Sequence, residues 1–110
     1  MIPESKIDAA LAHLQNKADE AAQARANVKY LAEFLKSKRA QLKLAQKPGT
    51  SNADREDAAY ADASYIEVLE GYKAAVELDA WHSFKREAAI ALIDAWRSQQ
   101  ANQRAEGRIG

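Results

Sequence analysis

The chain has 110 residues, of which 25 are alanine, 16 are basic, 16 are acidic and none is cysteine. The length suits one domain, and we expect residues 1–110 to form a single helical domain. The lack of cysteine excludes disulfides, and two histidines, His13 and His82, are too few for a zinc site of the usual Cys/His type. No signal-peptide-like run opens the chain, and no stretch approaches the roughly 20 apolar residues of a membrane span. We therefore expect a cytoplasmic protein without membrane contact.

Composition also limits the core. Beyond the 25 alanines there are only 27 larger apolar side chains. Alanine is the best intrinsic helix former, and only Gly71 could interrupt a long segment. The sequence therefore predicts an all-α fold, a long antiparallel helical hairpin of coiled-coil or bundle type. Its helices span about residues 4–46 and 64–101, with a short helix at about 53–61 between them.

The first predicted helix, residues 4–46, contains one complete heptad row. Every seventh residue is apolar, which favours a coiled-coil seam: Ile7, Leu14, Ala21, Val28, Leu35 and Leu42. A companion row is only partly apolar: Leu11, Ala18, Arg25, Ala32 and Arg39. The two arginines broaden the seam toward the face of a helix bundle.

Residues 47–52 contain Pro48 and Gly49 and predict a turn. After the short helix, Ser64 and Glu67 match a capping box, which places the start of the last helix at Ser64. Residues 98–110 are polar and without periodicity, so we expect a frayed helix end and a mobile tail there.

The last helix is apolar on more than one side. One stripe occupies its first half: Tyr65, Leu69, Tyr72, Val76 and Ala80. A second set falls on nearly the opposite side: Leu78, Trp81, Leu92 and Trp96. A lone hairpin cannot cover both sides, so we expect self-association, most simply a symmetric dimer with a four-helix core. An alternative is that Trp96 and Arg97 anchor a different protein, because Trp and Arg are typical hot-spot residues.

The net charge of zero hides an asymmetry. Residues 1–50 carry a net charge of +4 and residues 51–110 a net charge of −4. The two stretches lie beside each other in an antiparallel hairpin. The plainest interpretation is that they stabilise the hairpin, with each exposed pair contributing about 0–1 kcal/mol.

Two functional interpretations of the charges stay open. A basic cluster could bind the phosphates of a nucleic acid, with Tyr30 or Phe34 stacking on a base. The cluster consists of Lys36, Lys38, Arg39, Lys43 and Lys47. Alternatively, the acidic residues 54–79 could present a phosphate-like row of charge to a DNA-handling protein. A five-residue basic cluster in a neutral protein does not decide between the two interpretations.

The sequence offers little for catalysis. It lacks a glycine-rich phosphate loop, a Gly-x-Ser-x-Gly motif and a His-Glu-x-x-His motif. The acidic pairs lack the Glu-x-x-His spacing that metal sites in bundles use. We therefore expect a non-enzymatic protein with no catalytic residue, no metal and no cofactor.

Residues 93–106, which begin Ile93-Asp94-Ala95-Trp96-Arg97, resemble small helical proteins of tailed bacteriophages and prophages. Residues 60–69 and 30–36 share the likeness. The genes of such proteins often lie among those for recombination and replication. The resemblance therefore implies an accessory role that involves contact with DNA or with a DNA-processing protein. Two alternatives are an inhibitor or adaptor directed at a host nuclease, polymerase or defence factor, and a structural assembly component.

Overall fold

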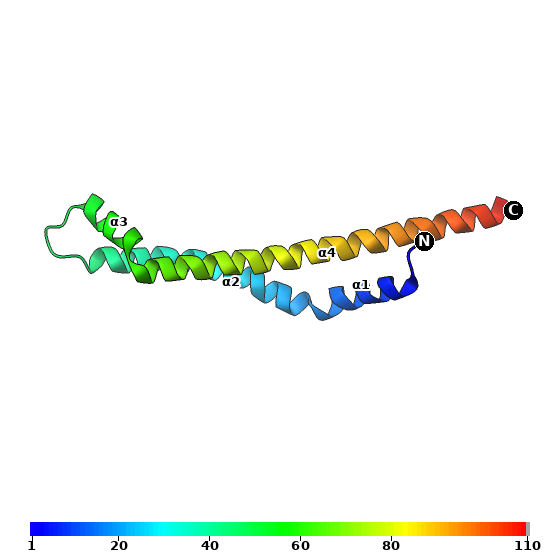
Figure 1. Ribbon diagram of the computed structural model, residues 1–110, viewed down its shortest axis with the longest axis horizontal. Coiled ribbons are helices and arrows are strands. Elements are labelled where there is room, and N and C mark those ends of the chain that lie inside the picture. The colour runs from blue at the N-terminus through cyan, green and yellow to red at the C-terminus, as the bar shows by residue number, and fades with distance from the viewer. Residues whose placement is uncertain (110) are drawn as a thin grey trace. The chain divides into compact units, whose positions relative to one another are not determined.

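The computed structural model describes residues 1–109, and this part of the chain forms four α-helices and no strand. In chain order they are α1 (Glu4–Asn16), α2 (Ala18–Leu44), α3 (Asn52–Ala61) and α4 (Ala63–Ile109) (Figure 1). The prediction of an all-α hairpin with a short intervening helix is confirmed. None of the described helices combines the length and the apolar character that a membrane crossing needs.

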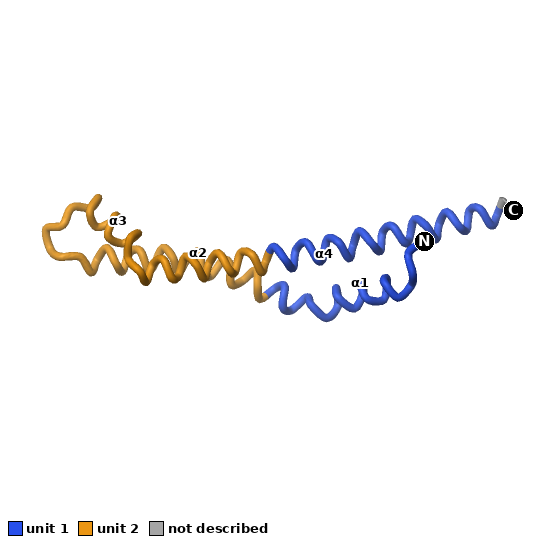
Figure 2. The backbone as a smooth tube through the Cα atoms, in the orientation of Figure 1, with its two compact units in different colours: residues 1–22, 80–110 blue, residues 23–79 orange. Residues whose placement is uncertain are grey.

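The helices divide into two compact units (Figure 2). Unit 1 combines Met1–Ala22 with Ala80–Gly110, and unit 2 is Gln23–Asp79. Each unit pairs one stretch of the first two helices with one stretch of α4, so each has its own contacts between helices.

Unit 2 is an antiparallel pair of helices closed by α3. Its buried residues are all alanines, namely Ala24, Ala59 and Ala75. Because a methyl group is small, the backbones can approach closely at these points, and larger side chains lie at the margins of the contact. Arg25 of α2 and Asp79 of α4 form an ion pair across the helices, with Nε and Oδ1 3.5 Å apart.

In unit 1, α1 lies along the C-terminal part of α4 (Figure 1). The main-chain N–H of Ile2 donates to Oε1 of Gln99 at 3.0 Å, and Nε2 of Gln103 lies 3.1 Å from the sulfur of Met1. The buried residues of this unit are Ile7, Ala10, His82 and Ala89. The first two residues of the chain therefore contact α4 at Gln99 and Gln103.

The predicted heptad row is confirmed, because all six of its members are buried or half-buried. The predicted companion row is wrong at three positions, since Leu11, Ala18 and Arg25 are exposed. Inward-facing residues lie one residue earlier in four of the heptads: Ala10, Ala24, Leu31 and Lys38. The equivalent residue of the second heptad, Lys17, is exposed.

Three boundaries differ from the prediction. The first helix is interrupted at Lys17, where φ is −105° and ψ is 1°; neighbouring Asn16 is a weak helix former. The last helix begins at Ala63, and Asp62 rather than Ser64 accepts the capping hydrogen bonds. It continues to Ile109, well past residue 101. The mobility of the tail stays a prediction.

Several side chains hold the turn between α2 and α3, and Arg55 makes the most hydrogen bonds among them. Gly49 has a φ of 87°, which only glycine adopts without strain. Ser51 begins α3 by accepting a hydrogen bond from the N–H of Asp54 at 3.1 Å. Arg55 of α3 then donates to three main-chain oxygens, those of Lys43, Lys47 and Thr50, at 2.7, 3.1 and 3.0 Å.

Candidate functional site

The predicted basic cluster lies in unit 2, on α2 and the turn that follows it. α2 is helical there because nothing between Ala18 and Leu44 breaks it, and the helix holds the cations at fixed angles around its axis. The structure brings acidic and phenolic groups of α3 and the start of α4 beside several of these cations.

Arg39 is engaged by Tyr60 of α3. Its Nη1 donates to the phenol oxygen at 2.6 Å, and its guanidinium carbon lies 5.7 Å from the centre of the same ring. The hydrogen bond to Tyr60 is the main cause that raises the pKa of Arg39 above its ordinary value. The ring of Tyr65 meets that of Tyr60 edge-on at 5.4 Å and helps to hold it in place.

Two of the lysines face acids of the same unit. Lys43 is half-buried, and its Nζ lies 3.8 Å from Oε1 of Glu56. The charge of Lys38 contributes to lowering the pKa of Asp62, although the larger causes are the side-chain and main-chain hydrogen bonds from Ser64. Part of the cluster therefore stabilises the hairpin, as the plainest interpretation of the charges expects.

The remaining cations of the cluster are exposed. Lys36 pairs with Glu33 on the same helix, at 3.1 Å, with both side chains largely in solvent. Such a pair contributes about 0–1 kcal/mol and is easily exchanged for another partner. Lys47 is also exposed.

Tyr30 and Phe34 form an exposed stack on α2. Their ring centres are 6.0 Å apart and their planes differ by 24°. Both side chains are exposed, Tyr30 more so than Phe34. Within unit 2, this stack and the two exposed lysines are the parts of the predicted nucleic-acid surface that stay open to solvent.

The predicted interface residues on α4 separate into two groups. Leu78 and Trp81 are exposed by 51% and 47%, whereas Leu92 and Trp96 are half-buried. Arg97 is exposed. Trp96 is thus part of the packing of unit 1, where its indole N–H is buried without an acceptor among the described residues.

Trp81 is surrounded by cationic and aromatic groups of unit 1. The ring of His13 on α1 meets it edge-on at 6.5 Å, and Nζ of Lys85 lies 5.6 Å from its centre. The adjacent His82 points inward and is buried. These contacts fix the orientation of the indole while leaving about half of it exposed.

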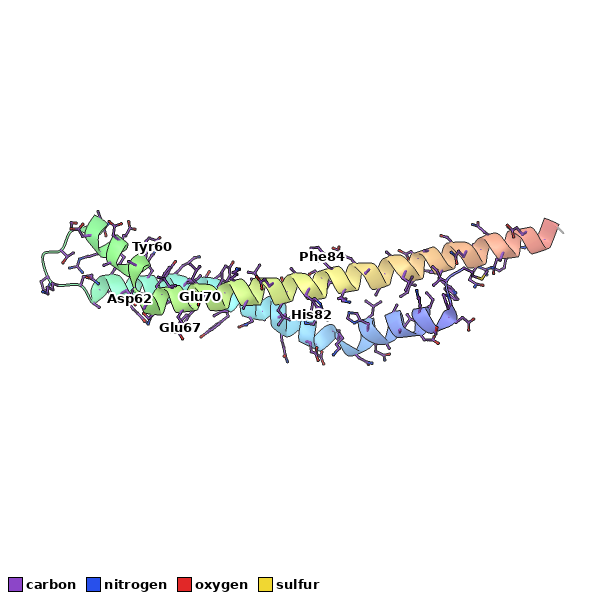
Figure 3. All side chains as sticks on the ribbon, in the orientation of Figure 1. Tyr60, Asp62, Glu67, Glu70, His82 and Phe84 are labelled. Carbon is purple, nitrogen blue, oxygen red and sulfur yellow. The ribbon has the colours of Figure 1, made fainter. Side chains whose placement is uncertain are left out.

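Phe84 is the most exposed large hydrophobic side chain of α4, at 69%, and it projects from the outer side of the helix, away from α1 (Figure 3). Three exposed alanines continue its stripe at helical spacing: Ala88, Ala91 and Ala95. A flat alanine surface beside an exposed aromatic ring suits contact with another helix.

Sequence reasoning missed Arg55, Asp62 and Tyr60. Asp62 was open to recognition, since Asp is a preferred N-cap residue. The roles of Arg55 and Tyr60 depend on how α3 folds back against α2, which no local pattern specifies.

Within the described residues, no group of three or more His, Asp or Glu side chains is arranged to hold a metal ion.

The comparisons with known proteins gave no match, whether with protein-family models, with curated proteins or with solved structures.

Proposed function

We propose that this chain is a non-enzymatic accessory protein of phage type, which acts in the bacterial cytoplasm by binding a DNA-processing protein. The observation that carries the proposal is the exposed position of Phe84 on an alanine stripe of α4. Exposed aromatic residues on a rigid helix are the usual anchors of protein interfaces. The engagement of Arg39 and Lys43 inside unit 2 supports a protein partner over naked DNA.

The class of partner comes from the resemblance of residues 93–106 to small helical phage proteins. A partner engaged in recombination or replication is consistent with that resemblance. An inhibitor or adaptor of a host nuclease or polymerase would use the same kind of surface, and the identity of the captured protein separates the two roles.

The test is capture from a bacterial lysate treated with nuclease, using the wild-type chain and a Phe84→Ser variant. We expect a recombination or replication protein to be retained by the wild type and lost by Phe84→Ser. A Glu87→Lys variant, altered at an exposed neighbouring position, serves as the matched control. Retention that disappears with nuclease, or that Phe84→Ser leaves unchanged, contradicts the proposal.

Direct contact with nucleic acid is a second candidate, favoured by one observation. Tyr30 and Phe34 form an exposed stack on α2, and a stack of this kind can accept bases. Gel-shift titration with single- and double-stranded DNA at low and high salt tests it. Salt-sensitive binding that Tyr30→Ala weakens supports this candidate, and no binding at micromolar protein excludes it.

A further inference from the structure

One face of α4 carries six exposed residues at alternating spacings of four and three: Glu67, Gly71, Ala74, Leu78, Trp81 and Lys85. All six belong to one uninterrupted helix, so the spacing alone places them within about 80° of one another around its axis. Alternation of four and three is the spacing of a coiled-coil seam. We call this face the α4 seam.

The order of side chains along the α4 seam is self-complementary. It begins with an acid and two small residues and ends with two large residues and a base. If a second identical helix lies antiparallel, with the midpoint of the pairing at position 76, each Glu67 faces a Lys85. In the same register each Gly71 faces a Trp81 and each Ala74 faces a Leu78. Every contact then joins opposite charges, or a large side chain and a small one.

The register centred on position 76 avoids unfavourable contacts that a shift of one heptad creates. Sliding one helix by a heptad places Glu67 opposite Leu92 and crowds Leu78 against Trp81. The first change leaves a carboxylate against an apolar side chain, and the second sets two bulky groups face to face.

Gly71 gives independent support, because the single chain has no need for a glycine there. Its φ is not positive, and nothing lies within 4 Å of where a Cβ would stand. Glycine inside a helix lowers helix stability relative to alanine. Gly71 has no role inside the single chain, but it would leave room for the bulky indole of Trp81 from a neighbouring molecule.

The apolar residues of the α4 seam are exposed to solvent in the single chain. Leu78 and Trp81 remain about half exposed, and no large side chain among the described residues is fully buried. A second copy on the seam would bury both residues and complete a core that one chain lacks.

We propose that the α4 seam is the surface on which a second copy of this chain packs, antiparallel, with Trp81 of each copy seated over Gly71 of the other. The interface is isologous, as a two-fold dimer requires. Ala88 of the Phe84 stripe borders the α4 seam, but Phe84 itself lies about 100° around the helix axis from the seam centre, so a dimer can still present Phe84 to a different protein.

A charge-exchange experiment tests the proposal by sedimentation equilibrium. Glu67→Lys and Lys85→Glu each place like charges opposite one another, and we expect each to raise the dimer dissociation constant by about tenfold or more. The double variant restores opposite charges in reversed order and should return the constant to within about threefold of wild type. Glu87→Lys, which lies on a different face of α4, should change little.

A second variant separates docking from folding. Gly71→Gln favours the helix but fills the space assigned to Trp81, so we expect a weaker dimer without loss of helix content. Gly107→Gln, at another open helical glycine, is the matched control. A wild-type chain that stays monomeric at high concentration overturns the proposal. So does a dimer that is indifferent to Glu67→Lys and Gly71→Gln, or a double variant that fails to recover.

Discussion

The guanidinium of Arg55 lies against the carboxyl end of α2, where its Nη1 donates to the main-chain oxygen of Lys43 at 2.7 Å. The last carbonyls of a helix have no partner within the helix. By also binding the carbonyls of Lys47 and Thr50, Arg55 satisfies three acceptors and fixes α3 against the turn. One side chain therefore ends α2, closes the turn and positions α3.

Replacing Arg55 should weaken the hairpin. We expect Arg55→Ala to lower the free energy of unfolding by about 1–3 kcal/mol, because three main-chain acceptors each lose one donor. The carbonyls of Lys43 and Lys47 keep hydrogen bonds from Gln46 and Thr50. Arg55→Lys should recover only part of the loss, since an ammonium cannot reproduce the planar fork of donors. Chemical denaturation followed by circular dichroism measures both values. A lysine variant as stable as wild type would contradict this role.

Asp62 should make stability depend on acid. Hydrogen bonds from the side chain and main chain of Ser64 lower the pKa of Asp62. Because the folded state binds the proton less tightly, the stabilising effect is complete above the ordinary Asp pKa of about 4 and is lost as the pH falls below it. Asp62→Asn keeps a capping oxygen without the charge. Between pH 6 and pH 2, melting curves should show a smaller loss for Asp62→Asn than for wild type, and equal losses would refute the assignment.

Lys43 and Lys47 should differ although they lie only four residues apart. Lys43 is half-buried and pairs with Glu56, whereas Lys47 is exposed. We expect Lys43→Gln to destabilise the chain by up to about 1 kcal/mol at low salt and Lys47→Gln to have almost no effect. The difference should shrink at about 0.5 M NaCl, because salt screens the pair. If the two variants unfold alike at low salt, the pair is not a stabilising contact.

The close approach at α3 depends on alanine. Ala59 is completely buried, whereas Ala61, at the end of the same helix, is exposed. Ala59→Leu should cost about 1–3 kcal/mol, because a larger side chain forces α3 away from its neighbours. Ala61→Leu should stay within about 0.5 kcal/mol of wild type. Thermal unfolding of the two variants checks the contrast, which would disappear if α3 were loosely attached.

The long helices could be predicted because local signals specify them. Val28, Leu35 and the other members of the first heptad row repeat without exception, and Pro48 with Gly49 marks the turn. The second inward row was harder to identify, because Ala24 and Lys38 look no more apolar than their neighbours. Lys38 is half-buried there because a lysine stem can lie along an apolar surface while its charge stays near solvent.

The interruption at Lys17 and the site contacts were beyond the sequence signals. No glycine or proline lies near Lys17, so no breaker marks the interruption. The hydrogen bond between Arg39 and Tyr60 joins residues 21 apart in the chain and forms only after α3 folds back. Trp81 was predicted as an interface residue, whereas the α4 seam depends on the exposure of its neighbours, which the sequence does not specify.

Disulfide trapping tests the antiparallel α4 seam most directly, since the native chain has no cysteine. Gly71→Cys and Trp81→Cys are prepared separately, mixed and oxidised. The ten residues that separate the two positions correspond to about 15 Å along a helix. In an antiparallel dimer centred on position 76, like cysteines are therefore too far apart for a disulfide, which needs Cα atoms within about 7 Å. We predict a cross-linked dimer from the mixture and none from either variant alone. Efficient cross-linking of Gly71→Cys alone, which indicates parallel pairing, or no cross-link in the mixture would contradict the account.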